Sequence, residues 1–187
     1  MIHIGSYEVS VQTADGQQKA AVLSSASVEE MPDAWWFSWP ELWNITDFDC
    51  QNIVKLSVDG RVWGLIRYGL YPFPGQPVFL EVEHVEANPL SRGILANRRV
   101  QPIGKWLIWY AVQTAFQRAL NADDDTLVIL TALASDFDYY RNSIQMECLG
   151  PLTIAPGEEG YVFRLTSTAA ASFCRQQERQ WGRPRSI

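Results

Sequence analysis

The sequence predicts a single α/β (α+β) domain, and three observations carry that prediction. Two strand-like runs flank the dipeptide Asp59-Gly60, which is typical of a tight hairpin turn. Residues 103–120 are mostly apolar and contain neither Gly nor Pro after Gly104, a pattern that predicts a long, largely buried helix. Residues 127–133 form an almost continuous apolar run, which suits a strand covered on both faces.

The N-terminal elements follow from alternation and from helix-breaking residues. Apolar and polar side chains alternate over 7–11, and an apolar run resumes over 20–23 after a Gly-containing turn, so we expect a strand hairpin. The pattern turns helical over 27–43, with two glutamates in its first turn. Because Pro32 and Pro40 would interrupt a continuous helix, we expect two short helices there.

Three strands should follow, the first two as an antiparallel pair over 53–58 and 62–71. After a turn rich in Pro and Gly, residues 78–85 alternate as a third strand. Alternate residues of a strand share a face, so two carboxylates should lie together on one side of it. In a regular strand one face carries Glu81, Glu83 and Val85, and the other carries Leu80, Val82 and His84.

The C-terminal half supplies the remaining elements. They are a turn-rich connection over 86–97, the long helix, an acidic turn over 121–126, a short helix around 137–143, and strands over 147–154 and 161–166. A helical segment rich in arginine follows from Ala169. We expect one domain over 1–187, with a core over 7–168 and a basic, solvated tail over 169–187.

Composition limits the classes of function. The 187 residues are 47% hydrophobic and carry a net charge of −6, with lysine scarce, which argues against a surface that binds nucleic acid. The odd set Cys50, Cys148 and Cys174, without short spacing, predicts neither a disulfide framework nor a zinc site. No apolar run approaches the roughly 20 residues that span a bilayer. We therefore expect a soluble, cytoplasmic protein that requires no metal.

The order of the elements adds a resemblance to a known family. Strand, two helices, three antiparallel strands, helix, strand, helix and two strands is the order of the GNAT superfamily of acyltransferases, which this sequence resembles over nearly its full length. The stretch RRVQPIGKWLIWYA also resembles the family motif Q/R-x-x-G-x-G/A, with Arg99 first, Gly104 last and Pro102 where the first Gly is usual. The resemblance implies the GNAT fold, a central mixed, mostly antiparallel sheet of about seven strands flanked by helices.

In this family the motif holds the pyrophosphate of coenzyme A, so acetyl-CoA or another acyl-CoA is the implied co-substrate. The physics fits, because a helix N-terminus offers unpaired N–H groups and a positive dipole end to an anion. The family's fourth strand also parts from the fifth and pairs with the pantetheine arm. The resemblance implies these cofactor-binding residues: Val85, Arg98, Arg99, Val100, Gln101, Ile103, Gly104 and Lys105.

The resemblance also implies a general base. In this family a carboxylate or a His on the fourth strand removes a proton from the acceptor amine, and Glu83 and Glu81 match that place. Repulsion between two carboxylates on one face would raise the pKa of one of them, which suits a base. We expect His84 on the opposite face, towards the core.

A Tyr on the helix after the fifth strand supports the departing thiolate in this family. The sequence DFDYYRNSIQMECLG resembles the family's aromatic-Tyr-x-x-x-Gly-aromatic pattern, with Tyr140 as the first candidate and Tyr139 as the second. The usual Gly is absent. If Gln145 takes its place, Arg141 rather than Tyr140 falls at the Tyr position.

The segment that commonly walls the acceptor site in this family is rich in aromatic residues. They are Trp35, Trp36, Phe37, Trp39 and Trp43. These residues either select an apolar or aromatic amine or pack the first helices onto the sheet. The connection over 86–97 either covers the CoA site or contacts another subunit, so a homodimer stays open.

The leading interpretation is an acyl-CoA-dependent N-acyltransferase that transfers acetyl from acetyl-CoA to a small-molecule or peptide amine by direct attack. The alternative is a GNAT-like acyl-CoA-binding or scaffold protein without catalysis, which Pro102 and the irregular Tyr pattern keep open. A relative that uses aminoacyl-tRNA as donor is disfavoured by the acidic charge. Neither nucleic acid nor a membrane is an expected partner.

Overall fold

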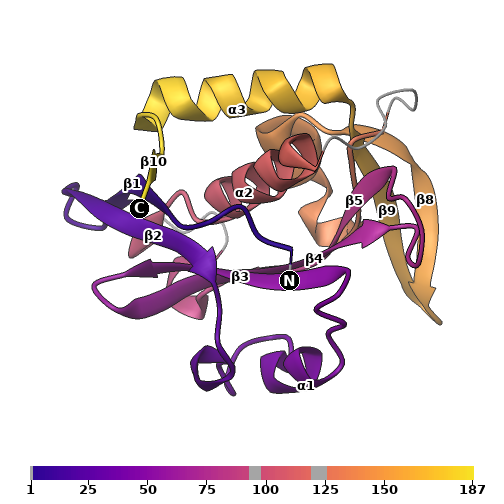
Figure 1. The fold of residues 1–187 in the computed structure, drawn as a ribbon, viewed down its shortest axis with the longest axis horizontal. Coiled ribbons are helices and arrows are strands. Elements are labelled where there is room, and N and C mark those ends of the chain that lie inside the picture. Colours follow the sequence, from indigo (N-terminus) through magenta and orange to yellow (C-terminus); the bar gives the residue numbers. More distant parts are fainter. Residues whose placement is uncertain (1, 93–97, 119–125) are drawn as a thin grey trace.

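The computed structural model of the protein describes residues 2–92, 98–118 and 126–187, which form one sheet with helices on both faces (Figure 1). The strands are β1 (Tyr7–Thr13), β2 (Gln18–Ser25), β3 (Gln51–Val58), β4 (Arg61–Tyr71), β5 (Phe79–Ala87), β6 (Val100–Gln101), β7 (Val128–Leu133), β8 (Glu147–Ala155), β9 (Glu158–Leu165) and β10 (Arg185–Ser186). The helices are η1 (Val28–Glu30), α1 (Trp39–Asn44), η2 (Pro89–Ser91), α2 (Gly104–Gln117), η3 (Ala134–Asp136), the π-helical η4 (Tyr139–Ile144) and α3 (Ser167–Trp181). None of the helices described is long and apolar enough to cross a bilayer.

The strand order is β10-β1-β2-β3-β4-β5-β7-β9-β8, and β6 also pairs with β1. All neighbouring strands are antiparallel except β5 and β7, which are parallel. The predicted class, a mixed and mostly antiparallel sheet flanked by helices, is confirmed. The described sheet has ten strands rather than about seven. Two of the additional strands, β6 and β10, are only two residues long and pair with β1. Their sequences are typical of a loop and of a C-terminal tail, so no strand was predicted for them.

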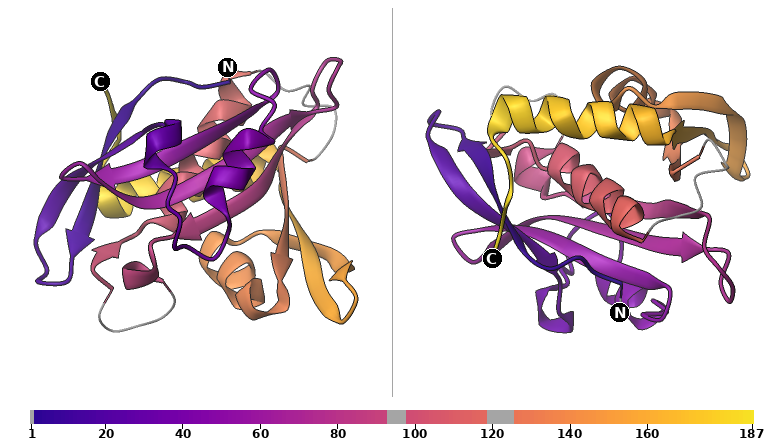
Figure 2. Two further views of the ribbon diagram at one scale, coloured as in Figure 1. Left: turned by 90° about the horizontal axis from the view of Figure 1, so that it is seen from below. Right: turned by 45° about the horizontal axis from the view of Figure 1, so that its top comes forward.

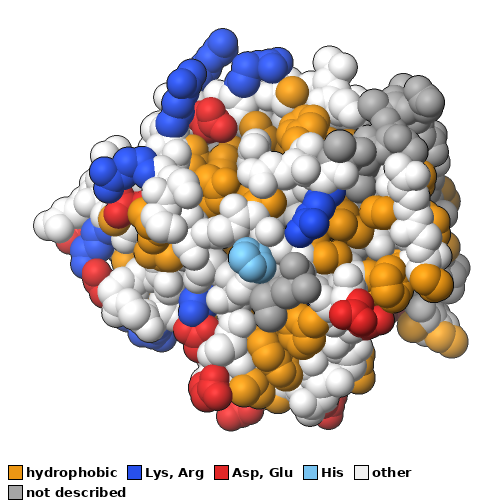
Figure 3. All heavy atoms as spheres, viewed as in Figure 1, with side chains coloured by type: hydrophobic (Ala, Val, Ile, Leu, Met, Phe, Trp, Pro, Cys, Tyr) orange, Lys and Arg blue, Asp and Glu red, His pale blue; other side chains and the backbone are white. Residues whose placement is uncertain are grey.

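Helix α2 lies on one face of the sheet and α3 lies over α2 (Figure 2). Nine of the 14 residues of α2 are buried, because the helix is covered from both sides. One face of α3 is buried through Ala170, Phe173, Cys174 and Gln177, a spacing of three and four residues. The prediction of a solvated tail was therefore wrong for α3. Its arginines do face solvent, and basic side chains gather along that upper edge in Figure 3.

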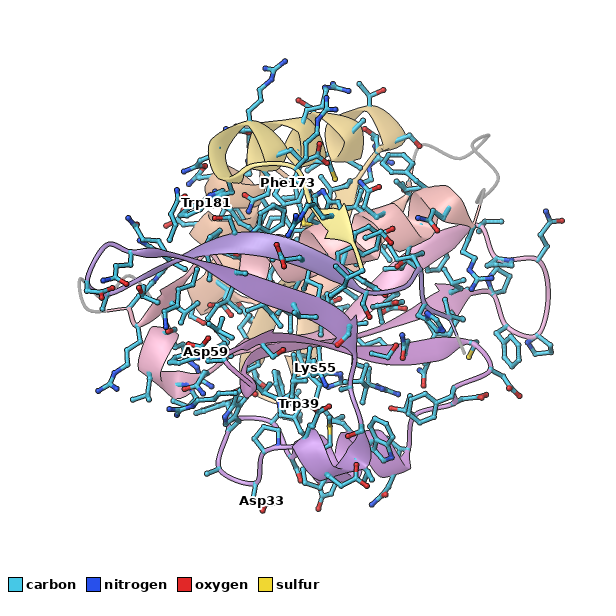
Figure 4. The ribbon with its side chains drawn as sticks, turned by 60° about the vertical axis from the view of Figure 1, so that its left-hand side comes forward. Asp33, Trp39, Lys55, Asp59, Phe173 and Trp181 are labelled. Carbon is cyan, nitrogen blue, oxygen red and sulfur yellow. The ribbon has the colours of Figure 1, made fainter. Side chains whose placement is uncertain are left out.

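The opposite face of the sheet is covered by α1 and by the aromatic side chains of Trp35, Phe37, Trp39 and Trp43, here called the aromatic layer. Trp39 is fully buried there against Ile53 and Leu65, between the sheet and α1 (Figure 4). The helical stretch predicted over 27–43 is reduced to η1 and α1. Pro40 lies in the first turn of α1 instead of interrupting a helix, because the N–H that proline lacks has no intrahelical partner at that position.

The sequence-based position of the β3–β4 turn is confirmed. The β3–β4 hairpin turns at Asp59 and Gly60, whose φ angles of 50° and 75° are those of the expected tight turn. Helix α2 ends at Gln117. The predicted end of that helix at 119–120 and most of the acidic turn lie outside the described residues.

Candidate active site

Strands β5 and β7 pair over only a short stretch and then part. Their parallel register joins residues 80–82 to 128–130. Beyond that point β5 continues to Ala87 against β4, and β7 continues to Leu133 against β9, so the strands diverge (Figure 2). Among the described residues, the edge of β5 that faces β7 has no strand partner from Glu83 onward.

A β-bulge in β5 falls at the point of divergence. Arg67 of β4 lies opposite His84, and the next residue of β4, Tyr68, lies opposite Val82. Glu83 is therefore an extra residue in β5. Up to Glu83, successive side chains of β5 point to alternate faces of the sheet. After Glu83, each side chain points to the face opposite the one that a regular strand would give it.

The bulge changes which side chains share a face. The His84 ring meets the Phe37 ring edge-on, with centroids 4.9 Å apart, and therefore lies on the side of the aromatic layer, as Glu83 does. Val85 packs instead against the core cluster that contains α2. The predictions that Val85 shares the glutamate face and that His84 lies opposite were wrong, because they assumed a regular strand.

Glu83 is held by side chains from β3 and β4. Its Oε1 accepts hydrogen bonds from Gln51 Nε2 at 2.7 Å and from the Tyr71 hydroxyl, and its Oε2 pairs with Nη1 of Arg67. Arg67 also donates to Oε1 of Gln51 at 2.8 Å and to Oγ1 of Thr46 at 2.9 Å. Burial, with the bond to Glu83, raises the pKa of Tyr71 to about 12, so its phenol remains a donor at neutral pH.

Glu81 lies on the same face, within the paired part of β5. Opposite it is Gly69, where a Cβ would come within 2.7 Å of the Tyr71 ring. The bare backbone at Gly69 thus lets this ring fold back towards Glu83. Burial raises the pKa of Glu81, and the neighbouring charge of Glu83 adds to that shift. The predicted pairing of two carboxylates on one face is confirmed.

His84 carries an unused polar atom. Its Nδ1 is buried and has no hydrogen-bond partner in the part of the chain that the structure describes. Burial lowers the pKa of His84, and Arg67 lowers it further, against an opposing contribution from Glu83. The imidazole is therefore uncharged at neutral pH.

Glu86, to which the sequence suggested no role, ties the aromatic segment to β5. Its carboxylate accepts hydrogen bonds from the backbone N–H of Trp36 at 2.7 Å and of Phe37 at 3.1 Å, and from Nε1 of Trp39 at 2.9 Å. It also pairs with Arg92. The side chain is 4% exposed. In a regular strand, Glu86 would point towards α2. It points towards the aromatic layer because of the bulge, so the sequence pattern alone could not have identified its role.

The aromatic residues of this segment divide between core and surface. Trp39 is fully buried, and Trp43 packs beside Phe48 with ring centroids 4.8 Å apart. Phe37 reaches His84, whereas Trp36 is 73% exposed. The expected packing role is therefore confirmed for Trp39 and Trp43, and the walling of an acceptor site stays a prediction.

The start of α2 lies beside the diverging strands. At Gly64 of β4 a Cβ would come within 2.9 Å of Leu107 in α2 and 3.4 Å of the Glu86 carbonyl oxygen, so the helix packs on bare backbone next to the end of β5. The Tyr139 hydroxyl stands over Gly104, 2.5 Å from where a Cβ would lie. The first turn of α2, the end of β5 and η4 therefore converge.

Part of the predicted pyrophosphate motif is committed elsewhere. Val100 and Gln101 form β6 against β1. The Val100 N–H donates to Ser91 Oγ at 2.9 Å, and the Arg99 N–H donates to the Leu90 carbonyl at 3.3 Å. Backbone N–H groups that could meet an anion are therefore those of the first turn of α2, whose N-cap provides no side-chain cap.

Three basic side chains border that turn. Arg99 is exposed. Arg98 is half-buried, and its Nε is buried with no hydrogen-bond partner among the described residues. Burial lowers the pKa of Lys105. A buried guanidinium nitrogen without a partner beside an uncapped helix start fits a ligand with anionic oxygens.

The two candidate tyrosines of η4 have different surroundings. Tyr140 is 7% exposed and packs on Phe163, with ring centroids 5.7 Å apart, and burial raises the pKa of its phenol. The Tyr139 ring lies 5.2 Å from that of Tyr140, and its hydroxyl is the one at Gly104. Both phenols lie next to the convergence point, one inside the core and one at the start of α2.

No family model and no curated protein matches the sequence. Solved structures do match. An N-acetyltransferase from Staphylococcus aureus Mu50 is 14% identical, with a TM-score of 0.57 over 79% of this chain and 98% of that chain. Ribosomal-protein-alanine N-acetyltransferase from Brucella melitensis is 16% identical, with a TM-score of 0.55 over 77% of this chain and 98% of its own.

The GNAT domain of S. lividans PAT is 14% identical, with a TM-score of 0.52 over 84% of this chain and 97% of that domain. The chain has the GNAT fold. The element order on which the resemblance rested is thereby confirmed. In the order of the GNAT fold, β5 and β7 take the places of the fourth and fifth strands, and α2 takes the place of the helix between them.

Proposed function

We propose that this protein is an acyl-CoA-dependent N-acyltransferase that transfers acetyl from acetyl-CoA to an amine. The observation that carries the proposal is the convergence, at the parting of β5 and β7, of an uncapped helix start at Gly104 with a polar face on β5. Two of the proteins that share the fold are named N-acetyltransferases, and N-acetyl transfer is a reaction of this class.

The start of α2 suits the pyrophosphate of acetyl-CoA. The N–H groups in the first turn of α2 offer donors to an anion, which would have to displace the Tyr139 hydroxyl from its place over Gly104. The unpaired inner edge of β5 near Val85 suits pairing with an extended pantetheine arm. The proposed cofactor-binding set is Val85, Arg98, Arg99, Val100, Gln101, Ile103, Gly104 and Lys105. The Arg99 N–H is bonded to Leu90, so Arg99 would act through its side chain. Val100 fits the set least well, because its N–H is bonded to Ser91 and its side chain lies in the core.

The face of β5 that is turned towards the aromatic layer suits the acceptor. An amine attacks a thioester only when its nitrogen is unprotonated, so a base must take a proton from the ammonium form. The titratable groups on this face are Glu81, Glu83 and His84. We assign Tyr140 to donate a hydrogen bond to the thiolate as the C–S bond breaks, because burial keeps its phenol protonated.

The second candidate function is an acyl-CoA-binding or scaffold protein without catalysis, and contacts that crowd the start of α2 favour its scaffold form. The motif segment Val100–Gln101 is committed to β1, and Pro102 contributes no N–H group. The Tyr139 hydroxyl also fills the space over Gly104. These contacts would have to be accommodated by any ligand at the start of α2.

Calorimetry with acetyl-CoA, CoA and longer acyl-CoAs, followed by a screen of amines for thiol release, tests both candidates. Binding of acetyl-CoA together with amine-dependent release of thiol supports the enzyme. Binding without thiol release from any amine supports the second candidate. Absence of binding rejects the enzyme and the acyl-CoA-binding protein and leaves only the scaffold.

A further inference from the structure

The chain has three lysines, and two of them are committed to carboxylates. Lys19 Nζ lies 2.7 Å from Asp59 Oδ2, and Lys55 Nζ pairs with Glu30. The hydrogen bond to Asp59 raises the pKa of Lys19, because it stabilises the charged ammonium. An ammonium held in an ion pair keeps its proton, and a protonated amine cannot attack a carbonyl carbon.

The third lysine, Lys105, has different surroundings. It is half-buried in the first turn of α2 and has no ion-pair or hydrogen-bond partner among the described residues. Its Nζ still meets solvent, because it is not one of the fully buried polar atoms that lack a partner. Burial lowers the pKa of Lys105, and the positive end of the helix dipole also disfavours a cation in this turn. A lysine so placed releases its proton more readily than a solvated lysine does.

We propose that Lys105 is a self-acylation site, at which the protein takes up the acetyl group of its own donor. This inference rests on the proposed function, because the donor is the thioester that the protein would bind. The neutral Nζ attacks the thioester carbonyl carbon, so that the C–N bond forms and the C–S bond breaks. The departing thiolate takes up the proton that Nζ loses. The products are an acetyl-lysine and a free thiol.

This step takes a thioester from solution while no donor occupies the start of α2. A pyrophosphate bound there would hold Lys105 as an ammonium and protect it. Acetylation removes the charge of Lys105, whereas the guanidinium groups of Arg98 and Arg99 stay charged. The acetylated protein would therefore bind an anionic donor less tightly. An excess of acetyl thioester would in this way lower the affinity of the protein for its own donor.

The first experiment measures which lysine reacts. The folded parent is incubated at neutral pH with S-acetyl-N-acetylcysteamine, a thioester that lacks the nucleotide part of CoA, and peptide mass spectrometry follows acetylation of each lysine. Lys19 and Lys55 are the internal controls. We expect Lys105 to react first in the folded protein and all three lysines to react at similar rates in urea, where the fold is lost. Desulfo-CoA, which has no thiol, should slow the reaction at Lys105 and leave that at Lys19 unchanged.

The second experiment measures the effect of the modification on the donor site by calorimetry with CoA. The acetylated parent, freed of reagent, and Lys105→Gln should bind CoA about 10- to 100-fold more weakly than the untreated parent, because a charge-assisted bond to phosphate is lost. Lys19→Gln removes a charge from an exposed ion pair and is the matched control. Lys105→Arg keeps a cation that thioesters do not modify, so treatment with the thioester should not change its affinity for CoA.

Two results would overturn the proposal. One is acetylation of the three lysines at equal rates in the folded protein. The other is equal affinity of the acetylated and the untreated parent for CoA. If the untreated parent binds no CoA, the proposed function fails, and the effect of acetylation on the donor site fails with it. Reaction of Lys105 with the short thioester needs no CoA site, so the first experiment separates failure of the modification site from failure of the proposed function.

Discussion

Glu86 illustrates how much a single carboxylate holds in place. It collects two backbone N–H groups and one indole N–H from the aromatic segment, on a side chain that is almost fully buried. Glu86→Ala would leave these donors without an acceptor, and each unsatisfied buried donor costs about 1–3 kcal/mol. We expect the free energy of unfolding, measured by urea denaturation, to fall by about 3–5 kcal/mol.

The matched control is the ion-pair partner of Glu86. The Arg92 side chain is 42% exposed, so solvent screens its charge, and pairs with an exposed partner contribute about 0–1 kcal/mol. Without Arg92, the buried carboxylate of Glu86 still keeps its three N–H donors. Arg92→Ala should therefore change stability by no more than that. Equal losses in the two variants would show that the ion pair, and not the N–H donors, anchors the segment.

The tyrosines of η4 can be separated by removing one hydroxyl at a time. Tyr140→Phe should lower kcat by about 10²-fold, because a donor to the developing thiolate is lost, and should leave acetyl-CoA affinity unchanged. Steady-state kinetics and calorimetry measure the two quantities. The ring of Tyr140 keeps its packing against Phe163 in this variant.

Tyr139→Phe is the matched control for that experiment. Its hydroxyl lies over Gly104 at the start of α2, so its removal should alter acetyl-CoA binding before it alters kcat. If Tyr139→Phe instead shows the loss of kcat and Tyr140→Phe does not, the two roles are exchanged.

At the scale of elements, β5 shows where alternation stops being a guide. Sequence pattern placed Glu81 and Glu83 together correctly, because both precede the shift in register. It failed for His84 and Val85, because a bulge depends on how β5 pairs with β4 and leaves no mark in the sequence of one strand. The position of His84 on the side of the aromatic layer therefore became visible only in the structure.

Strand β6 and the π-helical form of η4 were missed for related reasons, although the short helix itself was predicted around 137–143. Strand β6 is only two residues long and exists because it pairs with β1, which is distant in sequence. Helix η4 is π-helical, and its wider turn holds more residues than an α-helical turn. The family pattern assumes the spacing of an ordinary helix, so aligning this segment with it cannot decide whether Tyr140 or Arg141 takes the place of the family's Tyr.

The contact between η4 and α2 can be tested as a pair. Gly104→Ala places a methyl group 2.5 Å from the Tyr139 hydroxyl, and such overpacking costs about 1–3 kcal/mol. With Tyr139→Phe, the nearest remaining ring atom is Cζ at 3.4 Å, close to ordinary contact. We therefore expect Gly104→Ala to be less destabilising in the Tyr139→Phe background, by urea denaturation.

The difference between the two backgrounds isolates the contact. Any helix-propensity gain from alanine is present in both backgrounds and cancels in the double-mutant cycle. A cycle with zero coupling would show that η4 does not press on the start of α2.

For the whole molecule, the sequence predicted more of the fold than of the site. Element order comes from local hydrophobic periodicity and turn residues, which one chain displays, and it led to the correct fold. The site is made by contacts between distant segments, such as Tyr139 with Gly104 and Gly64 with Leu107. No periodicity encodes those contacts, so residue types could suggest candidates but could not place them.

Ligand-linked stability gives a test on the intact protein. A ligand that binds only the folded state raises stability by about 2.7 kcal/mol at a concentration of 100 times Kd, so acetyl-CoA should raise Tm. Differential scanning fluorimetry measures the shift. Gly104→Val, which puts a branched side chain at the start of α2, should abolish it. A parent-like shift in this variant would place the acetyl-CoA site elsewhere.

The bulge in β5 also has a meaning at the level of the gene. Without Glu83, Val82 would still face α2 and His84 would still face the aromatic layer, so the remaining residues alternate as in a regular strand. Insertion or deletion of this one codon would therefore add or remove a carboxylate and leave every other side chain of the strand on its present side.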